Sequence, residues 1–375
     1  MKKVVIAIDS FKGCLPSVEA GKAAAEGIRS IYPECEVICL PIADGGEGML
    51  DVLIMATNGQ EVPISAHDPL MRWRNTYYGI SENEETAFIE MASISGLPLV
   101  PPERRNPMLT TTYGTGEIIR DALERGCRNF IIGIGGSATN DAGLGMLQAL
   151  GFRFSDKEGK EVGTGRGEVL IKVAHIDSTF VHPALNSCRF TVACDVQNPF
   201  YGPEGAAYVF APQKGADREM VEALDAGLQN FAEVIRHTTG KDISHHPGAG
   251  AAGGMGGSLL AFLNAELKPG IQLMLEALDF SNKIKSADLI ITGEGKADRQ
   301  TLMGKVPSGI LAEARKQNIP VILLAGNIED SDELQQAGFE GVFSVNPPFI
   351  SLEEAMRPEV ACKNIQQTVE SICKK

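Results

Sequence analysis

Val4-Val5-Ile6-Ala7-Ile8-Asp9-Ser10-Phe11-Lys12-Gly13, close to the start of the chain, is the stretch that indicates the fold. Its apolar first half is continuous, as in a parallel strand that is buried on both faces. The residues that follow have the spacing of an amphipathic helix: Ser17 as its cap, then Ala20, Ala24, Ile28 and Ile31. A strand followed by a helix in this way is typical of a parallel α/β sheet.

The same alternation of strand and helix returns near the C-terminus. Strands are predicted at residues 288–292, 320–325 and 341–345, and helices at residues 308–317 and 356–373. Short strands and long glycine loops fill the middle of the chain, including a predicted helix at residues 258–267. We therefore predict a discontinuous flavodoxin-like or Rossmann-like α/β domain of residues 1–62 and 283–375, an inserted α/β domain of residues 63–282, and an active site in the cleft between them.

Composition narrows the classes of partner. The chain has 375 residues and a formal net charge of −14, which disfavours binding to nucleic acid or an anionic membrane. Its eight cysteines form no CxxC pair, so reduced thiols are expected. No signal peptide or bilayer-length apolar segment is evident, and we expect a cytoplasmic protein, as a monomer or homodimer.

Two groups of polar residues follow predicted strands in the first part of the chain. Asp9, Ser10 and Lys12 come directly after the first strand, where open parallel sheets bind their ligands. Asp44, Gly45 and Gly46 follow the second strand and precede another helix. Both groups are candidates for binding substrate or phosphate, although capped turns and tight strand–helix connections also use such residues.

A third candidate lies in the middle of the chain, between a predicted strand and a predicted helix. Its residues are Gly135, Gly136, Ser137, Thr139, Asn140 and Asp141. Glycines let a phosphate approach the backbone, hydroxyl groups donate hydrogen bonds, and a helix N-terminus favours negative charge. The loop lacks the ending of a Walker A motif, and an ordinary helix cap by Asn140 or Asp141 is the alternative.

Two further groups are rich in acids. Asp195 and Asn198 follow a predicted strand, and a carboxylate in that place can accept the proton of an attacking hydroxyl; capping of the Asn-Pro turn is the alternative. The other group contains Gly293, Glu294, Gly295, Lys296 and Asp298, with Lys305 nearby. Such a mixture of acids, lysines and glycines suits a polyphosphate with a bound metal.

A last glycine-rich segment, residues 248–257, is either an anion-binding loop or a flexible lid. His245 and His246 precede it without the spacing of a metal motif, and we interpret them as surface residues. No GxGxxG follows the first strand, which argues against an NAD-dependent oxidoreductase.

Taken together, four of these motifs resemble the bacterial type-1 glycerate kinase family. They are Ile8–Gly13, Ala43–Gly48, Gly135–Asp141 and Thr292–Gly295, and the resemblance extends from residue 2 to about residue 370. It implies ATP and Mg²⁺ as cofactors, D-glycerate as the acceptor, and 2-phosphoglycerate in preference to 3-phosphoglycerate as the product. It leaves open which loop holds the nucleotide and which holds glycerate.

The residues then suggest a hypothesis for in-line phosphoryl transfer. Asp195 orients or deprotonates the acceptor hydroxyl, Mg²⁺ is held near Asp298 or Glu294, and Lys296 or Lys12 offsets negative charge in the transition state. Two alternatives remain: a kinase for another small hydroxy acid, and a non-catalytic sensor of a phosphorylated metabolite.

Overall fold

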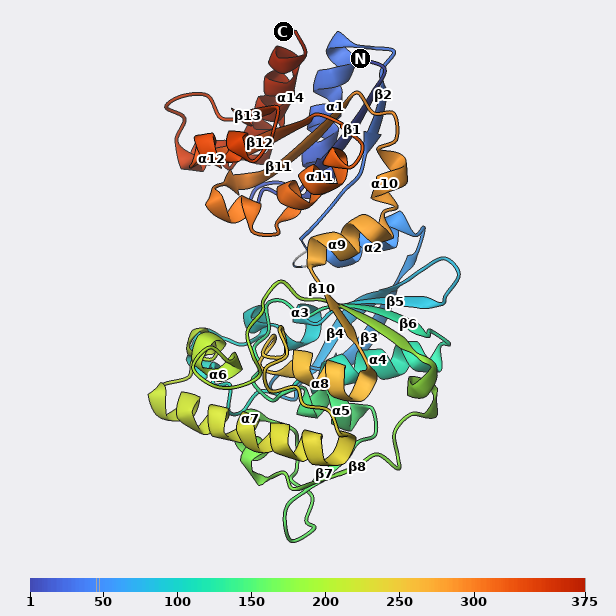
Figure 1. Cartoon of the computed structure of the whole chain (residues 1–375), viewed down its shortest axis with the longest axis vertical. Coiled ribbons are helices and arrows are strands. Elements are labelled where there is room, and N and C mark those ends of the chain that lie inside the picture. Colours follow the sequence, from blue (N-terminus) through green and yellow to red (C-terminus); the bar gives the residue numbers. More distant parts are fainter. Residues whose placement is uncertain (45, 47, 375) are drawn as a thin grey trace. The chain divides into compact units, whose positions relative to one another are not determined.

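The structure is a computed structural model of the chain, and it describes residues 1–44, 46 and 48–374 (Figure 1). The chain forms two compact units. We call Met1–Asp44 with Ile271–Lys375 the split unit, and Gly45–Gly270 the inserted unit. The predicted fold class, a discontinuous α/β domain with a second α/β domain inserted into it, is confirmed.

One parallel five-stranded sheet organises the split unit, in the order β13-β12-β11-β1-β2. Its strands are β1 (Lys3–Ile8), β2 (Glu36–Cys39), β11 (Leu289–Ala297), β12 (Val321–Ile328) and β13 (Gly341–Ser344). Numbered along this unit alone, the order is the 2-1-3-4-5 of flavodoxin-like sheets. In such sheets ligands bind beyond the carboxyl ends of the strands, where the strand order reverses, which here lies between β1 and β11.

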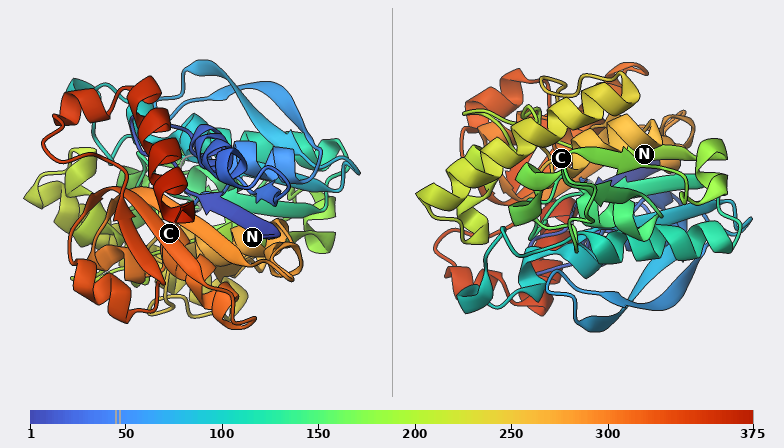
Figure 2. Two further views of the ribbon diagram at one scale, coloured as in Figure 1. Left: turned by 90° about the horizontal axis from the view of Figure 1, so that it is seen from above. Right: turned by 90° about the horizontal axis from the view of Figure 1, so that it is seen from below.

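Helices α1 and α14 pack side by side on one face of this sheet (Figures 1 and 2). Val4, Ile6 and Ile8 of β1 pack in the same apolar core as α1 and α14, because alternate residues of a strand share a face. The helices of the unit are α1 (Ser17–Ile31), α9 (Gly270–Ala277, which begins one residue before the boundary), α10 (Phe280–Lys283), η6 (Arg299–Leu302), α11 (Val306–Arg315), α12 (Ser331–Gln336), α13 (Leu352–Ala355) and α14 (Pro358–Cys373).

The inserted unit contains a mixed six-stranded sheet in the order β10-β9-β6-β5-β4-β3. β3, β4 and β5 pair antiparallel, whereas β5, β6, β9 and β10 are parallel. The strands are β3 (Gln60–His67), β4 (Trp73–Ile80), β5 (Thr86–Glu90), β6 (Asn129–Gly133), β9 (Arg189–Ala193) and β10 (Glu266–Lys268), with a separate antiparallel pair of β7 (Arg153–Ser155) and β8 (His175–Asp177).

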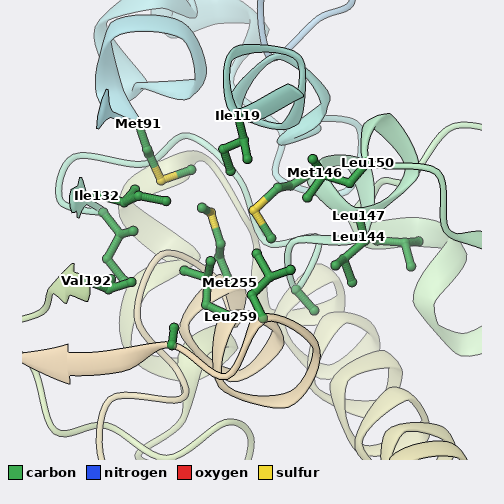
Figure 3. Packing of buried hydrophobic residues seen from close by; sticks show 14 of the residues in the cluster. Met91, Ile119, Ile132, Leu144, Met146, Leu147, Leu150, Val192, Met255 and Leu259 are labelled. Carbon is green, nitrogen blue, oxygen red and sulfur yellow. The ribbon is translucent and has the colours of Figure 1, made fainter. Parts of the chain in front are cut away.

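Helices cover this mixed sheet and close a large apolar core. Figure 3 shows part of that core, where Met91, Ile132 and Val192 of the sheet region pack with Met146 and Met255. The helices are α2 (Met49–Ala56), α3 (Ala92–Ser95), η1 (Leu97–Leu99), η2 (Pro102–Arg104), α4 (Tyr113–Glu124), α5 (Leu144–Ala149), η3 (Gly167–Lys172), η4 (Pro183–Ser187), α6 (Ala206–Phe210), η5 (Pro212–Lys214), α7 (Arg218–Thr239) and α8 (Met255–Leu263).

The boundaries between the units differ from the predicted ones at both ends of the insertion. Helix α2 and strand β3 belong to the inserted unit, because β3 pairs with β4 and α2 packs on β4 and β5. Residues 271–282 belong to the split unit, where the side chain of Ile271 packs against Gly309. Pairing between distant segments therefore sets the boundaries. A change in the local pattern of strands, turns and glycines along the sequence does not reveal that pairing.

Three local predictions are corrected. Strand β11 continues through the glycines that were expected to end it, because β12 pairs with it as far as Ala297. The helix predicted at residues 258–267 begins at Met255 and ends at Leu263, where Asn264 takes the left-handed conformation and β10 follows. Ser17 is the first residue of α1 and does not cap it; its hydroxyl donates to Ile8 O and accepts from Ile42 N.

Candidate functional site

A cavity of about 710 Å³ opens at the carboxyl ends of β1, β11, β12 and β13 in the split unit. It lies at the point where the strand order reverses, as expected for a sheet of this order. Predicted site residues that line it are Asp9, Ser10, Lys12, Asp44, Glu294, Gly295 and Lys296. The fold therefore brings together two groups of residues that lie more than half the sequence apart.

Asp9 is the most perturbed acid of this cavity. Only 7% of the residue is exposed, and its carboxylate accepts the N–H of Ser10 at 2.7 Å. The pKa of Asp9 is raised to about 7, chiefly because burial disfavours the charged form, with added repulsion from Asp44 and Glu294. Crowded, partly desolvated carboxyl groups of this kind are frequent at functional sites.

Glu294 contributes a carboxylate with one satisfied and one unsatisfied oxygen. Its Oε2 lies 3.5 Å from Nζ of Lys305, while its Oε1 is buried without a hydrogen-bond partner among the described residues. Burial raises the pKa of Glu294, and hydrogen bonds from Thr301 and Lys305 act in the opposite direction. An orphaned buried acceptor indicates room for a donor or a cation that the protein itself does not supply.

The lysines of this cavity are its more exposed members. Lys12 Nζ lies 3.9 Å from Asp44 Oδ2. Lys296 pairs with Glu329 at 2.9 Å, and this hydrogen bond raises the pKa of the lysine. Both ammonium groups can reorient toward an anionic ligand, because long side chains at a surface are weakly held.

Ten of the residues that line the cavity are apolar. They are Phe11, Cys14, Val345, Pro347, Pro348, Ile350, Leu352, Ala355, Met356 and Ala361. Asn327, Ser344 and Asn346 add polar groups near the ends of β12 and β13. Sequence reasoning missed these three residues, although each lies at the end of a predicted or observed strand, which was the available signal.

Two residues predicted in this region make structural contacts and are not among the residues that line the cavity. Asp298 does not line the cavity; its carboxylate caps η6 by accepting Gln300 N–H at 2.9 Å, and Thr301 reciprocates. Gly293 lies inside β11, and a Cβ at this position would come within 2.5 Å of Leu324 O. Glycine is needed there for close strand packing, so ligand binding does not explain it.

The segment that begins with Asp44 connects the two units. Asp44 lies in the split unit, Gly46 lies in the inserted unit, and the predicted residue Gly45 falls outside the described residues. Gly48 has φ of +87° and precedes the first residue of α2. This left-handed conformation explains glycine at position 48 without any ligand.

In the inserted unit, the loop after β6 exposes Gly135 and Gly136 and buries the residues that follow them. Ser137 Oγ accepts a hydrogen bond from Lys214 Nζ at 2.7 Å, and Thr139 O accepts another at 2.7 Å. Sequence reasoning did not identify Lys214 as a candidate site residue. Its spacing from Ser137 in the chain gives no sign of this contact.

Asp141 is a buried acid in this loop that accepts several hydrogen bonds. Its carboxylate accepts hydrogen bonds from Thr112 N and Oγ1, both at 2.8 Å, and from the N–H groups of Gly143 and Gly145. These hydrogen bonds hold the backbone that leads into α5, whose N-cap residue is Gly143. Helix α5 begins only at Leu144 and is too short to act as the predicted anion-attracting dipole.

Asn140 and Thr139 leave buried polar atoms unsatisfied. Both amide atoms of Asn140 and the hydroxyl oxygen of Thr139 lack hydrogen-bond partners among the residues that the structure describes. Leaving such groups unpaired costs about 1–3 kcal/mol each, so they call for an explanation.

Asp195 lies at the same sheet edge as this loop. Gly133 pairs with Ala193, so Gly135 and Asp195 each follow the paired strand ends by two residues. The carboxylate of Asp195 is exposed and accepts Gly270 N–H at 2.8 Å. Asn198 donates to Glu204 O at 2.7 Å, a contact that orders the loop after β9.

The glycine-rich segment at residues 248–257 is a buried scaffold, which contradicts the prediction of a lid. A Cβ on Gly253 would lie 2.1 Å from Thr139 O, and one on Gly256 would lie 2.3 Å from Gly248 O. The glycines thus allow backbone segments to pack closely, and they support the Gly135–Asp141 loop from behind. His245 and His246 are exposed, as predicted.

The described residues include neither a preformed metal site nor a membrane-spanning helix. No group of three or more His, Cys, Asp or Glu side chains there is placed to hold a metal by itself. None of the described helices has the length and hydrophobicity needed to cross a bilayer. The eight cysteines are free thiols, as predicted.

Comparison with known proteins gives a consistent result. The model of the glycerate kinase family matches residues 4–375. The glycerate kinase of Bacillus subtilis (strain 168) is 45% identical over 371 residues, which cover 99% of this chain and 96% of that protein. The glycerate 2-kinase of Escherichia coli (strain K12) is 48% identical over 356 residues, covering 95% and 93%.

A solved structure agrees with these sequence matches. It is the crystal structure of a Salmonella typhimurium LT2 protein assigned as glycerate kinase 2, which has a TM-score of 0.91 and 44% sequence identity. The match covers 100% of this chain and 97% of that one.

Proposed function

Because this chain belongs to the glycerate kinase family, we propose that it transfers the γ-phosphoryl group of ATP to D-glycerate and forms 2-phosphoglycerate. The observation that carries this proposal is the match along nearly the whole chain, including the relative named glycerate 2-kinase. The reaction breaks the bond between the γ-phosphorus and the oxygen that bridges to the β-phosphate. A new bond forms to the acceptor oxygen, whose proton passes to a base, and ADP leaves with the electron pair.

We assign the nucleotide to the cavity of the split unit. Its volume of about 710 Å³ lies within the range of cofactor sites, and its lining combines apolar and charged residues. This combination suits a ligand that has both an aromatic base and phosphates. Lys12, Lys296 and Lys305 supply positive charge for the phosphates.

The acidic residues that line this cavity also suit Mg²⁺. Glu294 Oε1 is an orphaned acceptor among the described residues. Burial, and to a lesser extent repulsion from Asp44 and Glu294, raises the pKa of Asp9, and a bound cation would oppose both effects. Mg²⁺ is usually held by one or two carboxylates together with substrate phosphates, so a preformed cage is not required. Asp9, Asp44 and Glu294 are its candidate ligands, and the ion would neutralise phosphate charge.

The acceptor is assigned to the inserted unit. Asp195 is the candidate base, because its carboxylate is exposed at a strand end beside the Gly135–Ser137 loop. Its Gly270 contact holds one carboxylate oxygen and so orients the group. Such a base acts by hydrogen bonding to the acceptor hydroxyl and taking its proton during transfer.

A direct assay tests this function. Purified protein is incubated with ATP, Mg²⁺ and D-glycerate, with L-glycerate and other hydroxy acids in parallel, and phosphorus NMR follows the products. We expect ADP release that depends on D-glycerate and a phosphorus signal from position 2. Turnover with another acid alone would make the chain a kinase of different substrate, and binding of ATP without any turnover would favour a sensor.

The cytoplasm is the proposed location, because ATP is available there and thiols remain reduced. Eight free cysteines support this assignment.

A further inference from the structure

Lys214 is a buried lysine beneath the loop that follows β6. Only 2% of the residue is exposed, and its ammonium group donates to Ser137 Oγ and to Thr139 O, each at 2.7 Å. An ammonium group has three N–H bonds to donate, and these acceptors take two of them. The contact joins η5 to a loop that lies 77 residues earlier in the sequence.

This ammonium group has no direct counter-ion among the described residues. Asp141 is the charged group that faces it, but the Asp141 carboxylate is already satisfied by Thr112, Gly143 and Gly145. Burial lowers the pKa of Lys214 to about 7, although the Asp141 charge acts in the opposite direction. Burying an unpaired cation is unfavourable, and an anion that binds nearby would remove much of that cost.

The loop above Lys214 has the form of a receptor for such an anion. Gly135 and Gly136 are exposed, and a Cβ on Gly135 would meet only open space. Since the Ser137 oxygen accepts from Lys214, its own O–H remains available to donate. The unsatisfied Asn140 amide and Thr139 hydroxyl lie in the same loop, which is a second sign that a polar partner is missing.

We propose that Lys214 is a positioning residue for an oxyanion site at Gly135–Ser137, where the carboxylate of the acceptor binds. This inference rests on the proposed function, because it assigns part of the same acceptor site. Lys214 orients the Ser137 hydroxyl toward the oxyanion and adds its positive charge from below. A phosphate of the nucleotide has the same chemistry, and the experiment distinguishes it from a carboxylate.

A purely structural clamp is the competing explanation, since Lys214 also holds the carbonyl of Thr139. A clamp would affect stability and turnover without discriminating between substrates. An oxyanion site would instead raise the KM of one substrate selectively. Ser137→Ala separates the two, because it removes the hydroxyl and leaves the bond from Lys214 to Thr139.

The test measures kcat and both KM values for Lys214→Met, Ser137→Ala and the double variant. Lys241→Met is the matched control. Lys241 lies in the same unit, and its ammonium group also donates to backbone carbonyls, those of Leu260 and Ala261. We expect the KM for D-glycerate to rise about tenfold or more in both single variants, as for loss of a charge-assisted hydrogen bond. The KM for ATP should stay within about twofold.

The double variant tests whether Lys214 acts through Ser137. We expect its KM for D-glycerate to match that of Lys214→Met, because removing the lysine already removes the orientation of the hydroxyl. Titration calorimetry with D-glycerate and no ATP supplies a binding readout that does not depend on turnover. It should show the same loss of affinity.

Each outcome has a defined meaning. A rise in the KM for ATP alone would keep the oxyanion site and make its ligand a phosphate. Unchanged KM values in a folded Lys214→Met enzyme, or equal changes in Lys241→Met, would overturn the inference. A wild-type protein that neither binds nor phosphorylates D-glycerate would instead overturn the proposed function.

Discussion

Asp298 and Thr301 cap η6 reciprocally: Asp298 accepts the N–H of Gln300, and Thr301 Oγ1 accepts the N–H of Asp298 at 2.9 Å. Glu294, four residues earlier, instead lines the cavity with an unsatisfied oxygen. The pair predicted to hold Mg²⁺ thus has one member inside the cavity and one outside it.

Separate substitutions of Glu294 and Asp298 should distinguish their roles. We expect Glu294→Gln to lower kcat about 100-fold or more and to raise the Mg²⁺ requirement, because a metal ligand is lost. Asp298→Ala removes a helix cap, so it should lower Tm while kcat falls less than about fivefold. Steady-state kinetics across a Mg²⁺ titration check both, and equal losses in the two variants would restore Asp298 to the site.

Asp9→Asn should stabilise the protein and inactivate it. The folded-state pKa of Asp9 is about 7, above the ordinary value of 3.8, so the folded state holds a proton that the unfolded state has lost between these values. Stability from this group therefore falls as pH rises from about 4 to about 7. We expect Asn to raise Tm by about 2–5 °C at pH 8 and by much less at pH 5.

Scanning fluorimetry at the two pH values measures this difference, and an activity assay accompanies it. If the Tm of Asp9→Asn at pH 8 is lower than that of the wild type, the ionised carboxylate of Asp9 does not destabilise the folded state. Retained turnover would remove Asp9 from the proposed metal ligands.

Asp195→Asn should lower kcat by about 100-fold or more while ATP binding persists, because the variant keeps the shape and loses the base. Asp242→Asn is a suitable control, since Asp242 is an exposed acid of the same unit that accepts Ser244 N–H at 2.9 Å. Single-turnover kinetics with D-glycerate provide the measurement. Turnover near the wild-type rate would exclude Asp195 as the base.

Lys214→Met should change stability in a way that depends on pH. The folded-state pKa of Lys214, about 7, lies below the ordinary value of 10.5, so between these values the unfolded state binds more protons. The contribution of Lys214 to the free energy of unfolding of the wild type therefore becomes more favourable as pH increases above about 7. The difference in Tm, variant minus wild type, should therefore be most positive at pH 6.5 and should become smaller or more negative toward pH 9.5.

The same Tm measurements on Lys241→Met show how much of the change at alkaline pH comes from the loss of any lysine in this unit. A difference between Lys214→Met and the wild type that stays constant over this range would mean that Lys214 titrates normally.

Gly253→Ala should destabilise the loop at Gly135–Asp141. Its Cβ would lie 2.1 Å from Thr139 O, and its φ is +68°. Gly159→Ala is the control, because Gly159 also has positive φ, +80°, but meets open space. We expect about 1 kcal/mol of destabilisation in the control, from conformation alone, and several times that in Gly253→Ala, measured by chemical denaturation. Equal effects would mean that the close contact is unimportant.

The sequence by itself identified the first buried strand and the polar residues that follow it. Val4–Ile8 is apolar throughout, so burial on both faces follows from composition, and Asp9 must then lie at the carboxyl edge of the sheet. The same reasoning placed Asp195 after β9 and Glu294 close to the cavity. Local pattern was sufficient for Asp9 and Asp195 because an apolar run followed by polar residues marks the end of a buried strand.

Only the tertiary structure decided the role of each polar side chain. Lys214 contacts Ser137 through packing between distant segments, and no local pattern encodes that contact. Gly293 sits beside Leu324 because β12 pairs with an extended β11, whereas the same glycine would serve a loop if that strand stopped earlier. Asp298 caps a helix while Glu294 faces a cavity, although both belong to one charged motif. Burial and hydrogen bonding depend on the whole fold, which is why residue type alone did not separate them.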